Sequence, residues 1–157
     1  MNTLCYVRQG RRFVPVPNYV GYFYGTDGFQ KEKTSVSYAI VVSQDVNIAT
    51  LAFLSHSMIK MTWDNAKTFC AYIENGHVPS LVEMFQAMKF REQLQFGTFD
   101  AEWTFTELFS NGSHILAHCG WYFHWSPCEV VDGSNKTHRY YARPFFKINV
   151  LTGERIK

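Results

Sequence analysis

The sequence predicts an α+β fold, in which two helices pack on a twisted antiparallel sheet with long loops. Three observations lead to this expectation. Two well-capped helices lie in the middle of the chain, β-branched strand-like segments precede them, and further strand-like segments follow them. Segregated runs of strands and helices are typical of α+β domains rather than of alternating βαβ units.

Length and composition agree with one compact domain. The chain has 157 residues, of which 18% are charged and 17% aromatic, against about 25% charged residues in typical domains. This composition excludes disordered and coiled-coil proteins. We divide the chain into an extended N-terminal lead-in or docking segment, residues 1–30, and a single domain, residues 31–157. Prolines and glycines punctuate the first segment.

The elements of the domain follow in order. Residues 35–42 and 48–54 are β-branched and aromatic, and a polar loop between them predicts a hairpin. Thr62 can cap a first helix, whose apolar stripe recurs at helical spacing, and Gly76 is expected to end it in a left-handed conformation. Ser80 and Glu83 have the spacing of a capping box for a second helix, with an expected buried stripe of Leu81, Met84, Phe85 and Met88.

The last third of the chain reads as strands and loops. Residues 102–107 alternate, which predicts a strand with Trp103 and Phe105 on one face. Residues 113–118 and 121–125 predict two more strands. A polar turn over 131–136 and a final strand over about 138–150 complete the expectation.

Several segments resemble one known family in the right order. Met61–Tyr72 and Gly76–Glu83 resemble the helical half of a C-type-lectin-like domain, above all its bacterial and phage branch. Val20–Gly28, Glu102–Glu107 and Tyr141–Phe145 are similar to the lead-in, middle and closing segments of that branch. The branch is related in fold to formylglycine-generating enzymes and to phage receptor-binding proteins. The resemblance covers residues 20–149 and implies a fold with long loops that form a binding face.

The sequence departs from the metal-binding and enzymatic members of that fold. It has no Glu-Pro-Asn or Gln-Pro-Asp loop, so we expect no calcium site and no cofactor. Cys119 and Cys128 are the only pair that resembles the copper-binding cysteines of formylglycine-generating enzymes, and their spacing differs. Four histidines, at 114, 118, 124 and 138, lack a recognisable metal-ligand pattern. We therefore predict no catalytic residue.

Aromatic residues concentrate in 99–140, which corresponds to the binding face of the family. Tyr and Trp provide large amphipathic contact areas at low entropic cost. The side chains that we predict to bind a ligand are Trp103, Trp121, Tyr122, His124, Trp125 and Tyr140. Whether the odd or the even positions of 121–125 face outward stays open.

Charge is distributed unevenly along the chain. Residues 1–33 carry five basic and two acidic side chains, residues 136–157 carry six and one, and the segment between them carries four and ten. The asymmetry is either an ordinary solvated surface or a means of docking on an acidic partner. The docking residues would be Arg8, Arg11, Arg12, Arg155 and Lys157. No nucleic-acid-binding motif accompanies the basic residues.

These observations favour a non-enzymatic binding protein. No secretory signal or transmembrane segment is recognisable, so we expect no membrane insertion. The resemblance implies a phage virion protein of a fibre, tail or capsid decoration, assembled in the bacterial cytoplasm. Its expected partners are other virion subunits or itself, as a homo-oligomer, and a cell-surface glycan. The alternative is a carbohydrate-binding or adhesion module in the bacterial cytoplasm or at the surface, and the third reading is a copper enzyme.

Overall fold

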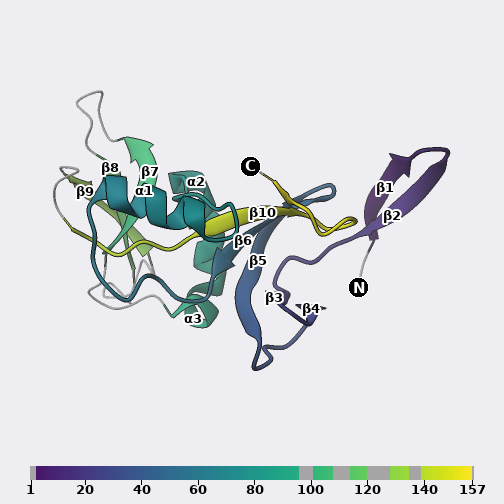
Figure 1. The fold of residues 1–157 in the computed structure, drawn as a ribbon, viewed down its shortest axis with the longest axis horizontal. Coiled ribbons are helices and arrows are strands. Elements are labelled where there is room, and N and C mark those ends of the chain that lie inside the picture. Colours follow the sequence, from purple (N-terminus) through teal and green to yellow (C-terminus); the bar gives the residue numbers. More distant parts are fainter. Residues whose placement is uncertain (1–2, 96–100, 108–113, 120–127, 135–138, 157) are drawn as a thin grey trace.

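The computed structural model describes residues 3–95, 101–107, 114–119, 128–134 and 139–156 (Figure 1). Strands and helices are segregated along the chain: in the described residues, six strands precede the helices and five follow them. The described strands form a two-stranded, a six-stranded and a three-stranded sheet. Neighbouring strands in each sheet are antiparallel. The predicted α+β class is therefore confirmed.

The six-stranded sheet is the centre of the molecule and has the strand order β11-β10-β6-β5-β3-β4. The predicted hairpin is confirmed, because β5 and β6 pair directly and turn at Val46, which has a φ of 51°. The strand bounds are β3 Phe23–Gly25, β4 Gly28–Gln30, β5 Ser37–Asp45, β6 Ile48–Phe53, β10 Phe145–Asn149 and β11 Arg155–Ile156. Since β3 and β4 belong to this sheet, the expected boundary at residue 30 runs through it.

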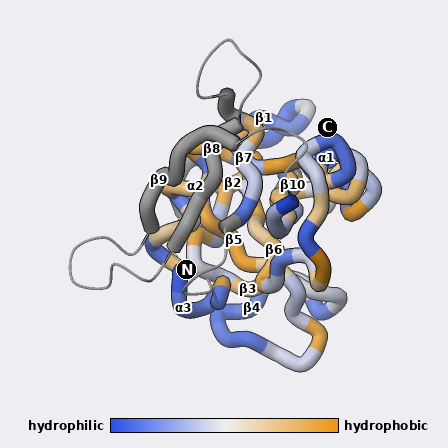
Figure 2. The backbone as a smooth tube through the Cα atoms, turned by 90° about the vertical axis from the view of Figure 1, so that its left-hand side faces the viewer, coloured by the Kyte–Doolittle hydropathy of each residue, from blue (hydrophilic) through white to orange (hydrophobic). Residues whose placement is uncertain are grey.

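Helices cover one face of this sheet and aromatic side chains cover the other. On the helical face, Ile40, Ala52 and Phe145 are buried against Met84 and Leu94. On the other face a second buried cluster is covered by partly buried side chains, namely Tyr19, Tyr24, Phe29, Tyr38, Phe53 and Val150. Figure 2 shows hydrophobic stretches of these strands toward the centre of the molecule. Most aromatic residues before residue 54 thus build the fold.

Both predicted helix starts are confirmed. Thr62 caps α1, Trp63–Tyr72, by accepting a hydrogen bond from the N–H of Asn65. Ser80 and Glu83 form the predicted capping box of α2, Leu81–Ala87. A 3₁₀ turn, η1 Met88–Phe90, and a short helix, α3 Arg91–Leu94, follow. The predicted buried stripe is only partly right, because Phe85 is 46% exposed and Ala87 takes the buried position.

The expected left-handed conformation of Gly76 is wrong. Glu74 and Asn75 have the positive φ angles, 56° and 54°. Gly76 is instead required for space, because a Cβ there would lie 2.7 Å from the carbonyl oxygen of Phe145 and 2.8 Å from those of Cys70 and Ile73. The glycine lets the loop after α1 pass close to β10, and His77 pairs with Phe145 as an isolated bridge.

The three-stranded sheet contains β7 Ala101–Glu107, β8 His114–Cys119 and β9 Cys128–Ser134. Trp103 of β7 packs with Trp63, Ala66 and Cys70 of α1 in a separate core cluster. Two expectations are wrong here. Residues 131–134 belong to β9 rather than to a polar turn, and the last long strand begins at Phe145 rather than near 138. The predicted strand at 121–125 lies outside the described residues.

The first two strands form a hairpin that projects from the body. β1, Thr3–Gln9, and β2, Arg12–Pro17, pair only with each other in the described structure. Figure 1 shows this hairpin at one end of the long axis of the molecule, away from α1, α2 and the three-stranded sheet. The first half of the expected lead-in is therefore a distinct β-hairpin, whereas its last residues belong to the six-stranded sheet.

Candidate functional site

A row of three polar side chains crosses the helical face of the large sheet. Strand register places Ser43 of β5 opposite Thr50 of β6, and Thr50 opposite Lys147 of β10. Directly paired residues project from the same face of a sheet. The same face is apolar at Ala52 and Phe145. The row therefore marks the place where the hydrophobic core ends and a polar surface begins.

The loop before α2 brings an imidazole and a carboxylate to this row. His77 Nε2 lies 3.0 Å and 2.8 Å from the two carboxylate oxygens of Glu83. The Glu83 carboxylate also accepts a hydrogen bond of 2.9 Å from the N–H of Ser80 as part of the capping box. One carboxylate thus fixes both the helix start and the orientation of the His77 ring.

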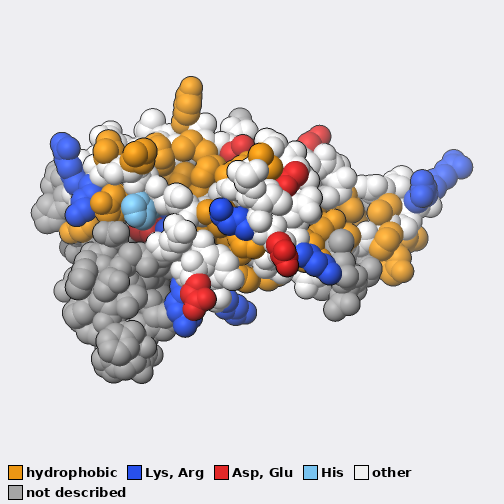
Figure 3. All heavy atoms as spheres, turned by 90° about the horizontal axis from the view of Figure 1, so that it is seen from below, with side chains coloured by type: hydrophobic (Ala, Val, Ile, Leu, Met, Phe, Trp, Pro, Cys, Tyr) orange, Lys and Arg blue, Asp and Glu red, His pale blue; other side chains and the backbone are white. Residues whose placement is uncertain are grey.

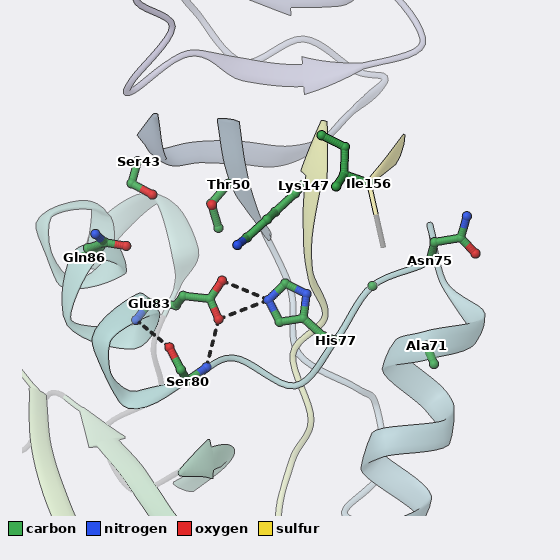
Figure 4. A pocket seen from close by; sticks show the side chains of 11 residues that line it. Ser43, Thr50, Ala71, Asn75, His77, Ser80, Glu83, Gln86, Lys147 and Ile156 are labelled. Carbon is green, nitrogen blue, oxygen red and sulfur yellow. Dashed lines mark hydrogen bonds and ion pairs between the residues drawn. The ribbon is translucent and has the colours of Figure 1, made fainter. Parts of the chain in front are cut away.

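Together these residues line a pocket of about 840 Å³. Figure 4 shows Lys147, Thr50 and Ser43 along the sheet side, with Glu83 and His77 facing them from the loop and α2. Gln86 and Asn75 lie at its two ends (Figure 4). The pocket is therefore formed by segments from three distant parts of the sequence, around residues 43–50, 71–86 and 147–156.

The electrostatics of the pocket keep Glu83 ionised. Burial alone would raise the pKa of this carboxyl, but hydrogen bonds from His77 and Ser80 and the nearby charge of Lys147 hold it below its usual value. Lys147 forms no hydrogen bond or close ion pair with a described residue. The pocket thus contains two charged groups: the Glu83 carboxylate, which is already hydrogen-bonded, and the Lys147 ammonium group, which is available to a ligand.

The side chains of the pocket suit polar binding better than metal ligation. In the part of the chain that the structure describes, no three His, Cys, Asp or Glu side chains come together to hold a metal ion. A carboxylate–imidazole pair activates a nucleophile only when a hydroxyl or thiol is hydrogen-bonded to the imidazole. Among the described residues, the hydrogen-bond partner of the His77 ring is Glu83, through Nε2, and no hydroxyl or thiol occupies that position.

The structure places the described ligand-binding candidates apart from this pocket. Trp103 is fully buried, and its indole N–H donates a hydrogen bond of 2.8 Å to the carbonyl of Met61. Tyr140 is half-buried and packs edge-on against Trp103, with ring centroids 5.1 Å apart. Trp103 therefore belongs to the core and offers no surface to a ligand. The other four candidates, Trp121, Tyr122, His124 and Trp125, lie outside the described residues.

The described docking candidates fall into two groups. Arg8, Arg11 and Arg12 are exposed at the outer end of the β1–β2 hairpin. Arg155 instead forms an ion pair with Glu74 and lies over the rings of Tyr24 and Phe146. Arg155 is thus engaged within the domain, and the docking expectation keeps only the N-terminal group. Lys157 lies outside the described residues.

The two cysteines considered for copper chemistry are cross-strand neighbours. The register of β8 and β9 places Cys119 opposite Cys128. Cys70, in contrast, is buried in α1, where burial raises the pKa of its thiol to about 12. The two cysteines, nine positions apart in the sequence, therefore occupy paired positions on neighbouring strands.

Sequence reasoning missed the pocket because its residues are distant in the chain. A signal was present: Thr50 and Lys147 are polar interruptions in otherwise apolar strands, and Ser43 begins the polar end of β5. Only the register of three strands shows that these interruptions form one row.

Comparisons with protein-family models, with curated proteins and with solved structures found no match. Among the described helices, none combines the length and the hydropathy that crossing a bilayer requires.

Proposed function

We propose that this protein is a non-enzymatic binding and assembly subunit of a phage particle, attached to an acidic surface of a neighbouring subunit by its β1–β2 hairpin. The observation that carries the proposal is the projection of this hairpin from the body with Arg8, Arg11 and Arg12 at its outer end. Figure 3 shows Lys and Arg side chains at that end of the molecule, with hydrophobic side chains beside them.

The hairpin has the properties of an unfinished interface. A lone two-stranded hairpin is at best marginally stable in water. Tyr6 and Phe13 are 66% and 71% exposed, which is unusual for such large side chains in a solvated strand pair. By strand register both project from the same face, because Tyr6 pairs with Pro15 and Phe13 with Arg8. Contact with a partner would bury these rings and add stability to the hairpin.

The two edges of the hairpin differ in their capacity to accept a further strand. β2 contains Pro15 and Pro17, which lack the N–H group that a β-ladder requires. β1 contains no proline, so its outer edge keeps its backbone donors and acceptors. We infer that a partner segment pairs along β1, with acidic side chains near the arginines.

The sequence resemblance supplies the biological setting of the proposal. Phage fibre tips and receptor-binding proteins use C-type-lectin-like domains, and two helices with a predominantly antiparallel sheet are compatible with that class of fold. In this setting the body of the domain would face outward while the hairpin holds it to the particle.

Mass spectrometry of purified particles tests this proposal. We expect the protein to be present at a constant copy number after density-gradient purification of the phage that encodes it. Its absence from particles whose capsid and tail proteins are all detected would overturn the virion assignment. Its recovery with a bacterial glycan-use system would favour the carbohydrate-binding module instead.

A further inference from the structure

We infer that the pocket between the large sheet and α2 is a binding site for a small oxyanion, a carboxylate or a phosphate group, held by Lys147 and the hydroxyl groups of Thr50 and Ser43. This inference is independent of docking through the hairpin, because the two sites share no residue.

The strand register builds the site. Ser43, Thr50 and Lys147 occupy directly paired positions on three adjacent strands, so their side chains form a continuous row on one sheet face. Adjacent strands are about 4.8 Å apart, a spacing that lets neighbouring side chains contact one small group. Figure 4 shows the three side chains lining the same side of the pocket.

Thr50 provides the strongest indication that the pocket binds a polar ligand. The residue is only 7% exposed, it lines the pocket, and its hydroxyl makes no hydrogen bond to any described residue. Buried hydroxyl groups almost always have a hydrogen-bond partner, and leaving one unsatisfied is unfavourable. A ligand oxygen in the pocket would satisfy it.

The balance of donors and acceptors identifies the ligand as an anion. Lys147 offers three N–H donors and no acceptor, and Gln86 adds an amide at the end of the pocket. Neither side chain is hydrogen-bonded to a described residue. The charged acceptor of the pocket is the Glu83 carboxylate, and it is already hydrogen-bonded to His77 and Ser80. An oxyanion supplies a negatively charged acceptor for the ammonium, and the hydrogen bonds between the two would be charge-assisted.

The Glu83–His77 pair positions the far wall of the pocket. Both oxygens of the carboxylate lie within hydrogen-bond distance of His77 Nε2, and the carboxylate also accepts from the Ser80 N–H, so its acceptors are directed at the protein itself. The carboxylate holds the His77 ring through Nε2, and both side chains face the row of Ser43, Thr50 and Lys147 (Figure 4).

Nuclear magnetic resonance titration of the full chain tests the inference. The probes are inorganic phosphate, glucuronate and, as the uncharged counterpart of glucuronate, glucose. We expect saturable shifts of the Thr50 and Lys147 signals with at least one of the two anions and none with glucose. A response to phosphate alone would identify a phosphate site, and a response to glucuronate alone a carboxylate site.

Variants test whether the anion is bound by Lys147 and Thr50. Lys147→Gln should weaken anion binding about tenfold or more, as expected for loss of a charge-assisted hydrogen bond, and Thr50→Val should weaken it about threefold. Lys147→Arg should restore binding, whereas Lys89→Gln, at an exposed lysine of η1, should change nothing. Absence of saturable shifts with both anions, equal binding of glucose, or full binding by folded Lys147→Gln would overturn the inference.

Discussion

Arg143 and Glu102 form a buried bidentate ion pair that joins the two larger sheets. Arg143 Nε and Nη2 each donate to one carboxylate oxygen of Glu102, both at 2.9 Å, and the side chains are 0% and 3% exposed. A third donor, Nη1, lies 2.7 Å from the carbonyl of Phe53 at the end of β6. One guanidinium therefore connects β7 of the small sheet to β6 of the large sheet.

Breaking this pair should destabilise the fold strongly. Glu102→Gln leaves the buried guanidinium without its counter-charge, and we expect a loss of about 3–5 kcal/mol in the free energy of unfolding. Urea denaturation followed by circular dichroism measures this loss. The double variant Glu102→Leu, Arg143→Met should recover much of it, because no charge then remains buried. Wild-type stability of Glu102→Gln would contradict the structural role of the pair.

Gly76 should not tolerate a side chain. In Gly76→Ala the new Cβ would meet three backbone carbonyl oxygens at 2.7–2.8 Å, so the loop or β10 must shift, at a cost of about 3 kcal/mol. Gly153→Ala is the matched control, because Gly153 has a φ of 80° and open space around it. That variant should cost only about 1–2 kcal/mol. Equal losses of thermal stability in the two variants would show that crowding at Gly76 is unimportant.

The capping box should make the free energy of unfolding depend on pH in the acid range. The pKa of Glu83 is lowered in the folded state, by His77 and Ser80 against the effect of burial. Its stabilisation is therefore present above the ordinary carboxyl pKa and is lost as pH falls through the lowered value. Unfolding free energies measured from neutral to strongly acid pH should fall less steeply for Glu83→Gln than for the wild type. Parallel pH profiles would rule out this contribution.

Tyr38 should ionise unusually late. Burial and the negative charge of Glu74 raise the pKa of this phenol to about 12, and its hydroxyl donates a hydrogen bond of 3.1 Å to Glu74. The protonated Tyr38 phenol therefore stabilises the folded state. This stabilisation is fully present below the ordinary tyrosine pKa of 10.0 and is lost as pH rises toward 12. In an absorbance titration, Tyr38→Phe should remove one late-ionising group. A Tyr38→Phe titration that keeps the same late-ionising absorbance change as the wild type would contradict this assignment.

Local signals in the sequence predicted the helices well. Thr62, Ser80 and Glu83 act within one helical turn, so their capping geometry depends on few other residues. The hairpin of β5 and β6 was equally local. The predicted turn over 131–136 is wrong for residues 131–134, because their pairing with β8, which comes from tertiary structure, outweighs their low strand propensity.

The candidate site could not be predicted in the same way. Ser43, Thr50 and Lys147 meet only through the crossover that pairs the last long strand with β6. Trp103 was expected at a binding face because aromatic composition does not distinguish a core from a recognition surface. Its burial against α1 depends on where the small sheet lies. The sequence thus predicts structure that depends on neighbouring residues, whereas it does not predict the pairing register of strands that are distant in the chain.

Copy number per particle is the decisive measurement for docking through the hairpin. The double variant Arg11→Glu, Arg12→Glu reverses two exposed charges at the hairpin turn, and Lys31→Glu, Lys33→Glu reverses two exposed charges on the body. Each variant would be supplied in place of the wild-type gene, and its fold checked by circular dichroism. We predict that particles lose the hairpin variant and keep the body variant at wild-type copy number. Full incorporation of the folded hairpin variant would contradict attachment through the basic hairpin.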